Sequence, residues 1–445
     1  MTLLTTRSPI QLVVPATTLR QAWHVLNPVP LDFANQPELA SALYIPHAAR
    51  LDQESGMAVS SPSKELSRAL LNSTSEMKAF LSGHVGSGKS TELRKVAAND
   101  EIRAKFFPIM MEIEGGYWDT LDIGQLLFLM ACTMYEYGNR EGLLKHREIW
   151  KEPFRAMVES FVGPSGVQAR EGAVGLEFDL IFVKLKQELK LEERRREQFR
   201  ELGQTKMSVL SRLLLGLSTD IEVSAAEMGD PRDPLLFIDD LDKVREPKAQ
   251  EATFRAKPGM FFEPPVRVVY TVPTGVAFND CPKNIRDQLV HLYPPPTLIK
   301  ASNSYNPEEA ANDVGILFLQ TVLRTRVGPN LIDPAAARLA AIYSGGMLRN
   351  FFWLLRTALD VADDNDRNKV DEAVMRVAIK SARLRESMPL HKEHYETLAE
   401  VHRTNFLAHG DAEYLDQSWV FECFNDKVWY EANPLLWKVL DPQHK

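Results

Sequence analysis

One stretch of the chain combines residue types and spacing suited to holding phosphate groups: Gly83-His84-Val85-Gly86-Ser87-Gly88-Lys89-Ser90. Its glycines let the backbone curl until successive N–H groups point inward, which forms a nest for an anion at the start of a helix. Lys89 would reach the outer phosphates of a nucleoside triphosphate, Ser90 would ligate Mg²⁺, and Thr91 would pack behind it. An ordinary glycine-rich turn is the alternative. The pattern therefore predicts a phosphate loop that binds ATP with Mg²⁺.

A second signal is an apolar run that ends in two carboxylates, Leu235-Leu236-Phe237-Ile238-Asp239-Asp240. A buried strand would bring Asp239 to the edge of a sheet beside the phosphate loop, where its carboxylate could hold Mg²⁺. Asp240 would then stand next to the attacking water. Strands also commonly end in Asp at ordinary turns. For Asp242 and Lys243, which follow, the pattern leaves a solvated turn and a functional role open.

The elements that must position these residues alternate along the chain. Strand-like apolar runs occur at 78–82, 106–113, 234–238, 266–271 and 296–299, and helical patterns separate them. Such alternation predicts an α/β fold with a doubly wound parallel sheet. Region 121–217 is mainly helical, with apolar residues spaced for a helix at 178–189 and a charged, solvated helical face at 192–197. After about residue 301 the pattern is helical again, and a hairpin at 419–430 precedes a short helix at 434–440.

Composition bounds the class of protein. With 445 residues, 44% hydrophobic and 25% charged, the chain is long enough for a core domain and one or two smaller ones. A formal charge of −8 argues against a surface built throughout for nucleic acid, although a local basic patch could still bind DNA. Three widely separated cysteines favour a reducing, cytoplasmic compartment. We identify no targeting segment and no membrane span.

The residues 86–93 (Gly-Ser-Gly-Lys-Ser-Thr-Glu-Leu) and 237–243 (Phe-Ile-Asp-Asp-Leu-Asp-Lys) resemble those of bacterial AAA+ ATPases and of the related signal-transducing STAND ATPases. The resemblance covers roughly residues 64–385. It implies that Thr271, with Thr274 as a substitute, senses the γ-phosphate from the end of a strand, although β-branched Thr is common in any strand. It also implies that Arg349, in Gly345-Gly346-Met347-Leu348-Arg349, is a lid arginine that reaches the nucleotide. A glycine-bounded surface helix is the alternative for that segment.

The resemblance also implies a division into domains. Residues 1–60 would be an irregular leader, 61–300 the phosphate-loop NTPase core, 301–385 a helical lid and 386–445 a small winged-helix-like domain. The long interval between Ser90 and Asp239 predicts a helical insertion at about 121–225, either a partner-binding surface or cover for one face of the sheet. The pair Asp239-Asp240 replaces the usual Asp-Glu, which makes slow turnover plausible. No arginine finger is identifiable among Arg245, Arg255 and Arg286.

These observations predict an ATP-binding and ATP-hydrolysing switch. The resemblance implies a homo-oligomer that controls a separate effector protein, for example a nuclease, in bacterial anti-phage defence. One alternative is a DNA-acting AAA+ protein, an initiator, loader or transposition regulator, that binds DNA through its C-terminal domain. The aromatic residues there, Trp419, Phe421, Trp429 and Trp437, are expected in a core more often than as a platform for bases. Another alternative is an ATP-bound scaffold that assembles partners without hydrolysis.

Overall fold

The computed structural model of the chain describes residues 14–47, 61–73, 76–113, 121–162, 201, 207–256, 258–278, 281–300, 304–425 and 427–442. The helical pattern predicted at 178–189 and the charged run at 192–197 lie outside these residues. Among the helices within them, none combines the length and the apolar character that crossing a bilayer requires.

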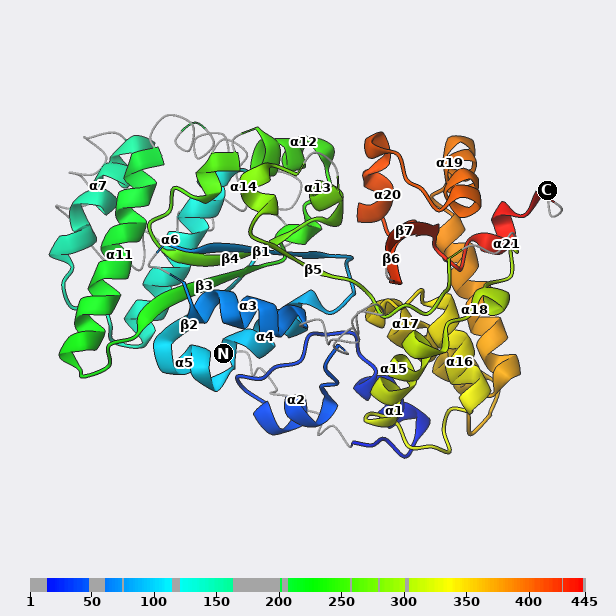
Figure 1. Ribbon diagram of the computed structural model, residues 1–445. Coiled ribbons are helices and arrows are strands. Elements are labelled where there is room, and N and C mark those ends of the chain that lie inside the picture. Colours follow the sequence, from blue (N-terminus) through cyan, green and yellow to red (C-terminus); the bar gives the residue numbers. More distant parts are fainter. Residues whose placement is uncertain are drawn as a thin grey trace, which may run out of the picture.

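A five-stranded parallel sheet forms the centre of the first half of the molecule (Figure 1). The strand order is β2-β3-β4-β1-β5, and every neighbouring pair is parallel. The strands are β1 (Lys78–Gly83), β2 (Phe106–Glu112), β3 (Asp233–Asp239), β4 (Arg267–Val272) and β5 (Leu289–Leu292). Every residue of β1 and β4 is buried, as expected for strands covered on both faces. The predicted α/β fold with a doubly wound parallel sheet is confirmed.

One predicted strand is wrong. The run 296–299 is not a strand of the sheet, and only Leu298 pairs there, in an isolated antiparallel bridge with Ala311. The fifth strand is β5, seven residues earlier, which pairs with β1. Prolines at 294, 295 and 296 have no N–H to donate to a sheet, which explains why the chain leaves the sheet before this run.

Two sets of helices cover the sheet. One face packs against α3 (Pro62–Leu71), α4 (Lys89–Ala97) and α5 (Asp100–Lys105). The other face packs against α6 (Ile123–Arg140) and α11 (Met207–Glu227), and α7 (Glu148–Val162) packs against α11. Figure 1 shows these helices at the β2 end of the sheet. The predicted insertion at 121–225 therefore supplies cover for the sheet in its described part. Shorter elements between the later strands are η2 (Leu241–Lys243), α12 (Pro247–Gln250), η3 (Glu251–Arg255), η4 (Pro258–Phe261), α13 (Thr274–Phe278) and α14 (Lys283–Arg286).

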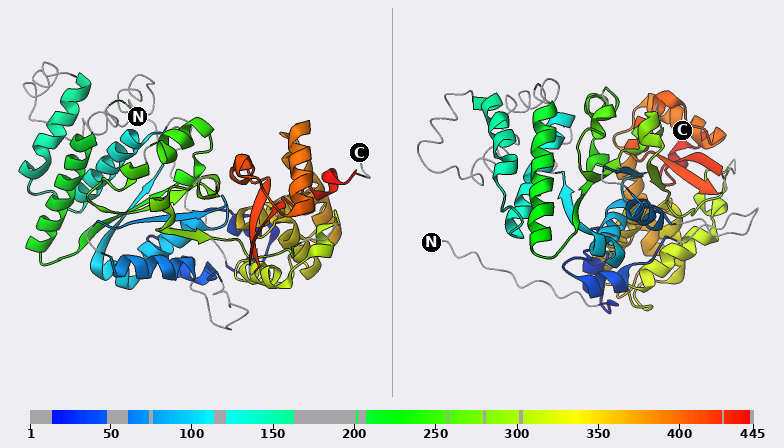
Figure 2. Two further views of the ribbon diagram at one scale, coloured as in Figure 1. Left: turned by 45° about the horizontal axis from the view of Figure 1, so that its top comes forward. Right: turned by 60° about the vertical axis from the view of Figure 1, so that its left-hand side comes forward.

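The second half of the molecule is a helical unit that lies beside the sheet, on the side of β1 and β5 (Figure 1). Its helices are η5 (Pro307–Ala310), α15 (Asp313–Arg324), α16 (Pro334–Tyr343), α17 (Leu348–Asp364) and α18 (Glu372–Ser387). The C-terminal elements are α19 (Lys392–Thr404), η6 (His409–Asp411), α20 (Glu413–Asp416), the antiparallel hairpin β6 (Val420–Asn425) and β7 (Lys427–Ala432), and α21 (Trp437–Leu440). Figure 2 shows the hairpin and α19 against the lid helices.

The lid and the C-terminal elements share one hydrophobic core. Phe421, Trp429 and Trp437 are almost completely buried in it, and Trp419 packs against it, so these side chains are core residues and offer no exposed platform for bases. The described part of the N-terminal segment also joins this core. It is not irregular as predicted, because it forms α1 (Leu19–Val25) and α2 (Pro37–Leu43). The boundaries of the predicted domains stay a prediction.

Candidate nucleotide site

The phosphate loop connects β1 to α4, as predicted from the spacing of its residues. Gly83, Gly86 and Gly88 have φ values of +144°, +91° and +112°, in the region that side chains disfavour. Gly88 forms the N-cap of α4, so the free N–H groups at the start of this helix face the loop. The buried Ser87 Oγ finds no hydrogen-bond partner among the described residues. The loop therefore has the backbone that an anion nest requires and an unused polar group beside it.

Lys89 is held inside the protein. Its Nζ donates hydrogen bonds to the carbonyl oxygens of Gly83 (2.5 Å) and His84 (2.8 Å). It also forms an ion pair with Asp242, with 2.8 Å between Nζ and Oδ2. Both side chains are less than a tenth exposed. Asp242, for which the sequence left a turn and a role open, is thus the counterion of Lys89, and a phosphate group could take its place.

Three carboxylates form a cluster at the end of β3. One oxygen atom of each of Asp239, Asp240 and Asp242 lies within 4.8 Å of the others. Burial, followed by repulsion from the other two carboxylates, raises the pKa of Asp239 to about 6, and a hydrogen bond from Ser90 opposes this shift. Asp240 has a left-handed backbone (φ 69°) and pairs with Lys243 at 2.6 Å. Crowded carboxylates, two of them buried, beside a hydroxyl are a donor set that fits Mg²⁺, because a divalent cation would offset their repulsion.

Thr271 lies next to this cluster, but its hydroxyl is used by the backbone. The Leu241 N–H donates to Thr271 Oγ1 at 3.0 Å, and the hydroxyl donates to the Ile238 carbonyl at 3.3 Å. The side chain is completely buried and does not line the cavity. Its contacts fix the turn that carries the carboxylates. Thr274 is also buried, at the start of α13. A role for either residue in sensing the γ-phosphate stays a prediction.

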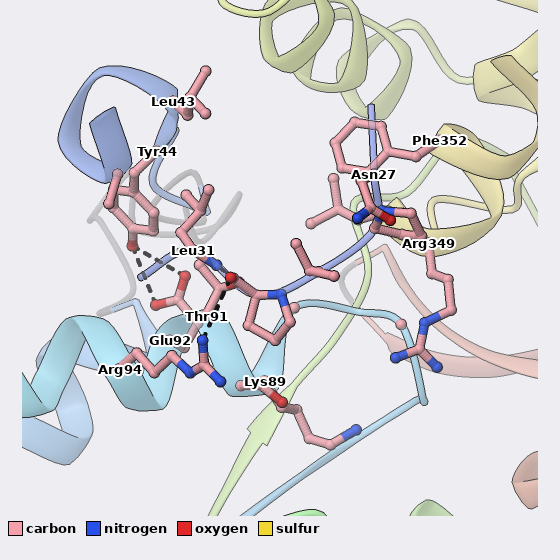
Figure 3. Close-up of a pocket in the computed structure, with 18 of the residues that line it drawn as sticks. Asn27, Leu31, Leu43, Tyr44, Lys89, Thr91, Glu92, Arg94, Arg349 and Phe352 are labelled. Carbon is pink, nitrogen blue, oxygen red and sulfur yellow. Dashed lines mark hydrogen bonds between the residues drawn. The ribbon is translucent and has the colours of Figure 1, made fainter. Parts of the chain in front are cut away.

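Arg349 stands at the start of α17 and contacts the phosphate loop directly. Its backbone N–H donates to the Gly86 carbonyl at 3.1 Å. A Cβ on Gly86 would lie 2.6 Å from the Cβ of Arg349, so the close approach depends on this glycine. Burial lowers the pKa of Arg349, and Asp242 and Asp240 oppose that shift. Figure 3 shows its guanidinium extending from α17 toward the loop and Lys89. Arg349 therefore lies against the phosphate loop, and its role at the nucleotide stays a prediction.

These residues line one cavity of about 650 Å³ between the sheet, the lid and the N-terminal segment. This size suits a small-molecule ligand. The loop and α4 contribute Val85, Gly86, Gly88, Lys89, Ser90 and Thr91, the acidic turn contributes Asp240, Asp242 and Lys243, and the lid contributes Phe318, Val322, Arg326, Leu348, Arg349 and Phe352. Asp239, at the end of β3, lies beneath this lining and reaches it through Ser90 and Asp240.

The N-terminal segment is the part of the site that sequence reasoning missed. Residues between 24 and 47 form a wall of the cavity. Tyr44 donates from its hydroxyl to Glu92 of α4 at 3.0 Å, and the Leu31 N–H lies 3.5 Å from Thr91 Oγ1. Figure 3 shows Leu31 and Tyr44 over α4, opposite Arg349 and Phe352. The sequence of this segment contains no motif typical of a ligand site. It contributes mostly apolar side chains to the wall of the cavity.

The C-terminal hairpin also contacts the phosphate loop. The Glu422 N–H of β6 donates to His84 Nε2 at 2.7 Å, and the Phe421 ring packs edge-on against the imidazole of His84. The Glu422 carboxylate pairs with His291 of β5 at 2.8 Å. Phe421 also packs against Gly345, where a Cβ would overlap its ring. One strand of the hairpin thus contacts the loop, the sheet and the turn before α17.

A buried carboxylate adds a second link between the C-terminal elements and the core. Asp416 of α20 accepts from Gln250 Nε2 at 2.7 Å and from the Gly275 N–H at 2.8 Å. Burial raises its pKa, and the charges of Arg245 and Arg255 oppose the shift. These two arginines thus act on a carboxylate of their own chain.

No protein-family model and no curated protein sequence matches this chain. Among solved structures, the chain is similar to a Walker-type ATPase of Pyrococcus abyssi, with 12% identity, a TM-score of 0.41 and coverage of 90% of this chain and 99% of that chain. It is also similar to Cdc6p from Pyrobaculum aerophilum, with 13% identity, a TM-score of 0.39 and coverage of 94% and 96%. A third is the ORC2 protein of Aeropyrum pernix, with 11% identity, a TM-score of 0.39 and coverage of 90% and 95%.

Proposed function

We propose that this chain binds and hydrolyses ATP with Mg²⁺ and that its nucleotide state controls the lid and the C-terminal hairpin. One observation carries the proposal: Lys89, the acidic turn with Asp240 and Asp242, and Arg349 all line a single cavity, although they come from three separate parts of the sequence. A glycine-rich turn or a surface helix with no function would not need this convergence.

The residues of the chain would divide the work as follows. The N–H groups of the phosphate loop would bind phosphate oxygens, and Lys89 would exchange the Asp242 carboxylate for the outer phosphates. Ser90 and Asp239 would hold Mg²⁺, which supplies charge neutralisation for the transferred phosphoryl group. Asp240 would orient the attacking water and accept its proton. Arg349 would place its guanidinium on the γ-phosphate, as its position at the loop allows.

The side chain of Asp240, after the end of β3, would affect the rate of ATP hydrolysis. Asp240 is shorter than the glutamate usual at this position in AAA+ ATPases, and it is paired with Lys243. Both features would hold the carboxylate back from a water above the γ-phosphate. We therefore expect slow turnover, as suits a switch whose bound state must persist.

Binding of ATP to wild-type protein and to Lys89→Ala tests the proposal. We expect the substitution to weaken binding at least tenfold, since it removes a charged donor to phosphate. The matched control is Lys64→Ala, at an exposed lysine of α3 outside the cavity, and we expect it to bind as wild type. Hydrolysis and mass in solution, measured on the same samples, separate a hydrolysing switch from an ATP-bound scaffold. Equal affinity of the Lys89 variant and wild type for ATP would refute the proposal.

The output of the switch is proposed from the resemblance to AAA+ and STAND ATPases. We propose a homo-oligomer that assembles or controls a separate effector protein, for example a nuclease, in bacterial anti-phage defence. Proteins that copurify with the chain, with and without ATP, test this part, and an effector bound equally to wild type and Lys89→Ala would contradict nucleotide control.

DNA binding by the C-terminal domain is the alternative output. It is tested by an electrophoretic shift at several salt concentrations, because phosphate contacts weaken steeply as salt rises. Because Trp429 and Trp437 are buried, DNA would have to bind through the charged side chains of this region. No shift at low salt with ATP present would end this version.

A further inference from the structure

Arg326 is a buried cation on the wall of the nucleotide cavity. It follows α15 and is 6% exposed. Burial lowers its pKa to about 10, and no nearby carboxylate opposes this shift within the described part of the chain. Burying a charge without a counterion is costly, so a guanidinium in such a place calls for an explanation.

The hydrogen bonds of Arg326 satisfy only one of its nitrogens. Nη1 lies 2.9 Å from the carbonyl oxygens of Leu43 and Val322 and 3.0 Å from Thr325 Oγ1. Among the described residues, neither Nη2 nor Nε donates to a protein acceptor, and neither is sealed off from solvent. Because Arg326 borders the cavity, its remaining N–H groups are available to a ligand there. A guanidinium has donors and no acceptor, so that ligand must offer acceptor atoms.

The position of Arg326 places it at the end of the cavity away from the phosphate loop. Its guanidinium lies over the ring of Phe352, 5.1 Å from the ring centre. Phe352 is about one turn, roughly 5 Å, further along α17 than Arg349, which contacts the loop. Figure 3 shows this separation, with Arg349 pointing toward Lys89 and Phe352 on the far side of the pocket. A nucleotide with its phosphates in the loop would extend its base toward this end.

We propose that Arg326 reads the base of the bound nucleotide and that the base is a purine. This inference rests on the proposed function, because it takes the phosphate loop as the site of the triphosphate. A purine offers ring-nitrogen acceptors on its edge, N7 above all, to the planar N–H groups of the guanidinium. Its two fused rings would fill the space between Leu43, Val322 and Phe352 better than the single ring of a pyrimidine.

A purely structural role for Arg326 makes a different prediction. The side chain joins the N-terminal segment, through Leu43, to α15, through Val322. If that were its whole role, its replacement would weaken the protein or the entire site, and all nucleotides would be affected alike. If Arg326 reads the base, its replacement removes the preference among bases and leaves phosphate binding unchanged.

The test measures dissociation constants of ATP, CTP and inorganic tripolyphosphate for three proteins: wild type, Arg326→Gln and Arg324→Gln. Arg324 is an exposed arginine two residues away and serves as the matched control. A hydrogen bond from a charged donor changes affinity roughly tenfold to a hundredfold. We therefore expect wild type and the control to bind ATP at least tenfold more tightly than CTP. In Arg326→Gln the ratio falls to about threefold or less, with an unchanged constant for tripolyphosphate.

Each other outcome has a definite meaning. A wild-type protein that binds tripolyphosphate but does not distinguish ATP from CTP overturns this inference and leaves the proposed function intact. A wild-type protein that binds no triphosphate overturns both. A preference for ATP that survives in Arg326→Gln overturns the role of Arg326. If the glutamine variant loses tripolyphosphate binding through misfolding, Arg326→Lys replaces it, because lysine keeps the charge and can bond to carbonyls but lacks the planar fork. The lysine variant must then lose the preference.

Discussion

Replacing His84 by glutamine tests how the phosphate loop is joined to the C-terminal hairpin. His84 is completely buried and accepts a hydrogen bond from the Glu422 N–H. Burial, aided by the charges of His291 and Lys89 and opposed by Glu422, lowers its pKa to about 3. A glutamine can accept the same hydrogen bond through its side-chain oxygen, but it does not titrate.

The sign of the effect follows from the two pKa values. In the unfolded chain His84 has an ordinary pKa of 6.5, so between pH 6.5 and 3 the unfolded state binds a proton that the folded state excludes. Stability therefore falls as pH drops through this range, by about 1.4 kcal/mol per pH unit. From pH 7.5 to pH 5 the loss attributable to His84 is about 2 kcal/mol.

Urea unfolding of wild type and His84→Gln at pH 7.5, 6.5, 5.5 and 5 measures this loss. We expect the free energy of unfolding of the variant to fall less toward pH 5, by about 2 kcal/mol relative to wild type. His409→Gln is the control, because His409 is exposed on the same C-terminal part of the molecule. Parallel pH profiles for wild type and His84→Gln would refute the reasoning, since they would mean that His84 is hydrated or protonated in the folded protein.

Three further changes test individual contacts. Gly86→Ala places a Cβ against the lid arginine at a positive φ, so we expect a loss of about 1–3 kcal/mol in stability and weaker ATP binding in calorimetry. Gly259→Ala, with open space around it, should change neither. Thr271→Val leaves the buried Leu241 N–H without a partner, so turnover should fall while the dissociation constant of ATP stays within about threefold of wild type. A loss of ATP affinity instead would favour direct contact between Thr271 and phosphate. Asp416→Asn exchanges a carboxylate for an amide that cannot accept hydrogen bonds from both Gln250 and Gly275. It should lower the urea midpoint by the equivalent of about 1–3 kcal/mol. Glu413→Gln, at an exposed residue, should leave the midpoint unchanged.

The central site could be predicted because its residues obey local rules. Glycines at 83, 86 and 88 are needed wherever a backbone adopts positive φ, and Lys89 begins the helix that follows. Four of the five strands could be found because each has an apolar run within it, as expected where helices cover both faces of the sheet. The position of Arg349 beside the loop could be predicted only through the resemblance to AAA+ and STAND ATPases, because nothing in its local pattern points to the loop.

The remaining features depend on contacts between distant parts of the chain. β5 has only four residues and includes His291, so its pattern is weaker than that of the apolar run at 296–299, which begins with the last of three successive prolines. Likewise, the N-terminal segment has no ligand motif and gains its role by packing on α4 and the lid. The role of Asp242 likewise depends on a distant contact, because its ion pair with Lys89 joins residues that are 153 positions apart in the sequence.

The contacts around the loop explain why nucleotide binding would move the lid and the hairpin together. For the loop to wrap a phosphate, Lys89 must leave Asp242 and the loop carbonyls that it now holds. The loop is bonded to α17 through Gly86 and to β6 through His84. Because α17 and β6 share one hydrophobic core, neither can shift without the other. A change at the loop would therefore pass to both elements as one movement, and a label on the hairpin should report ATP binding.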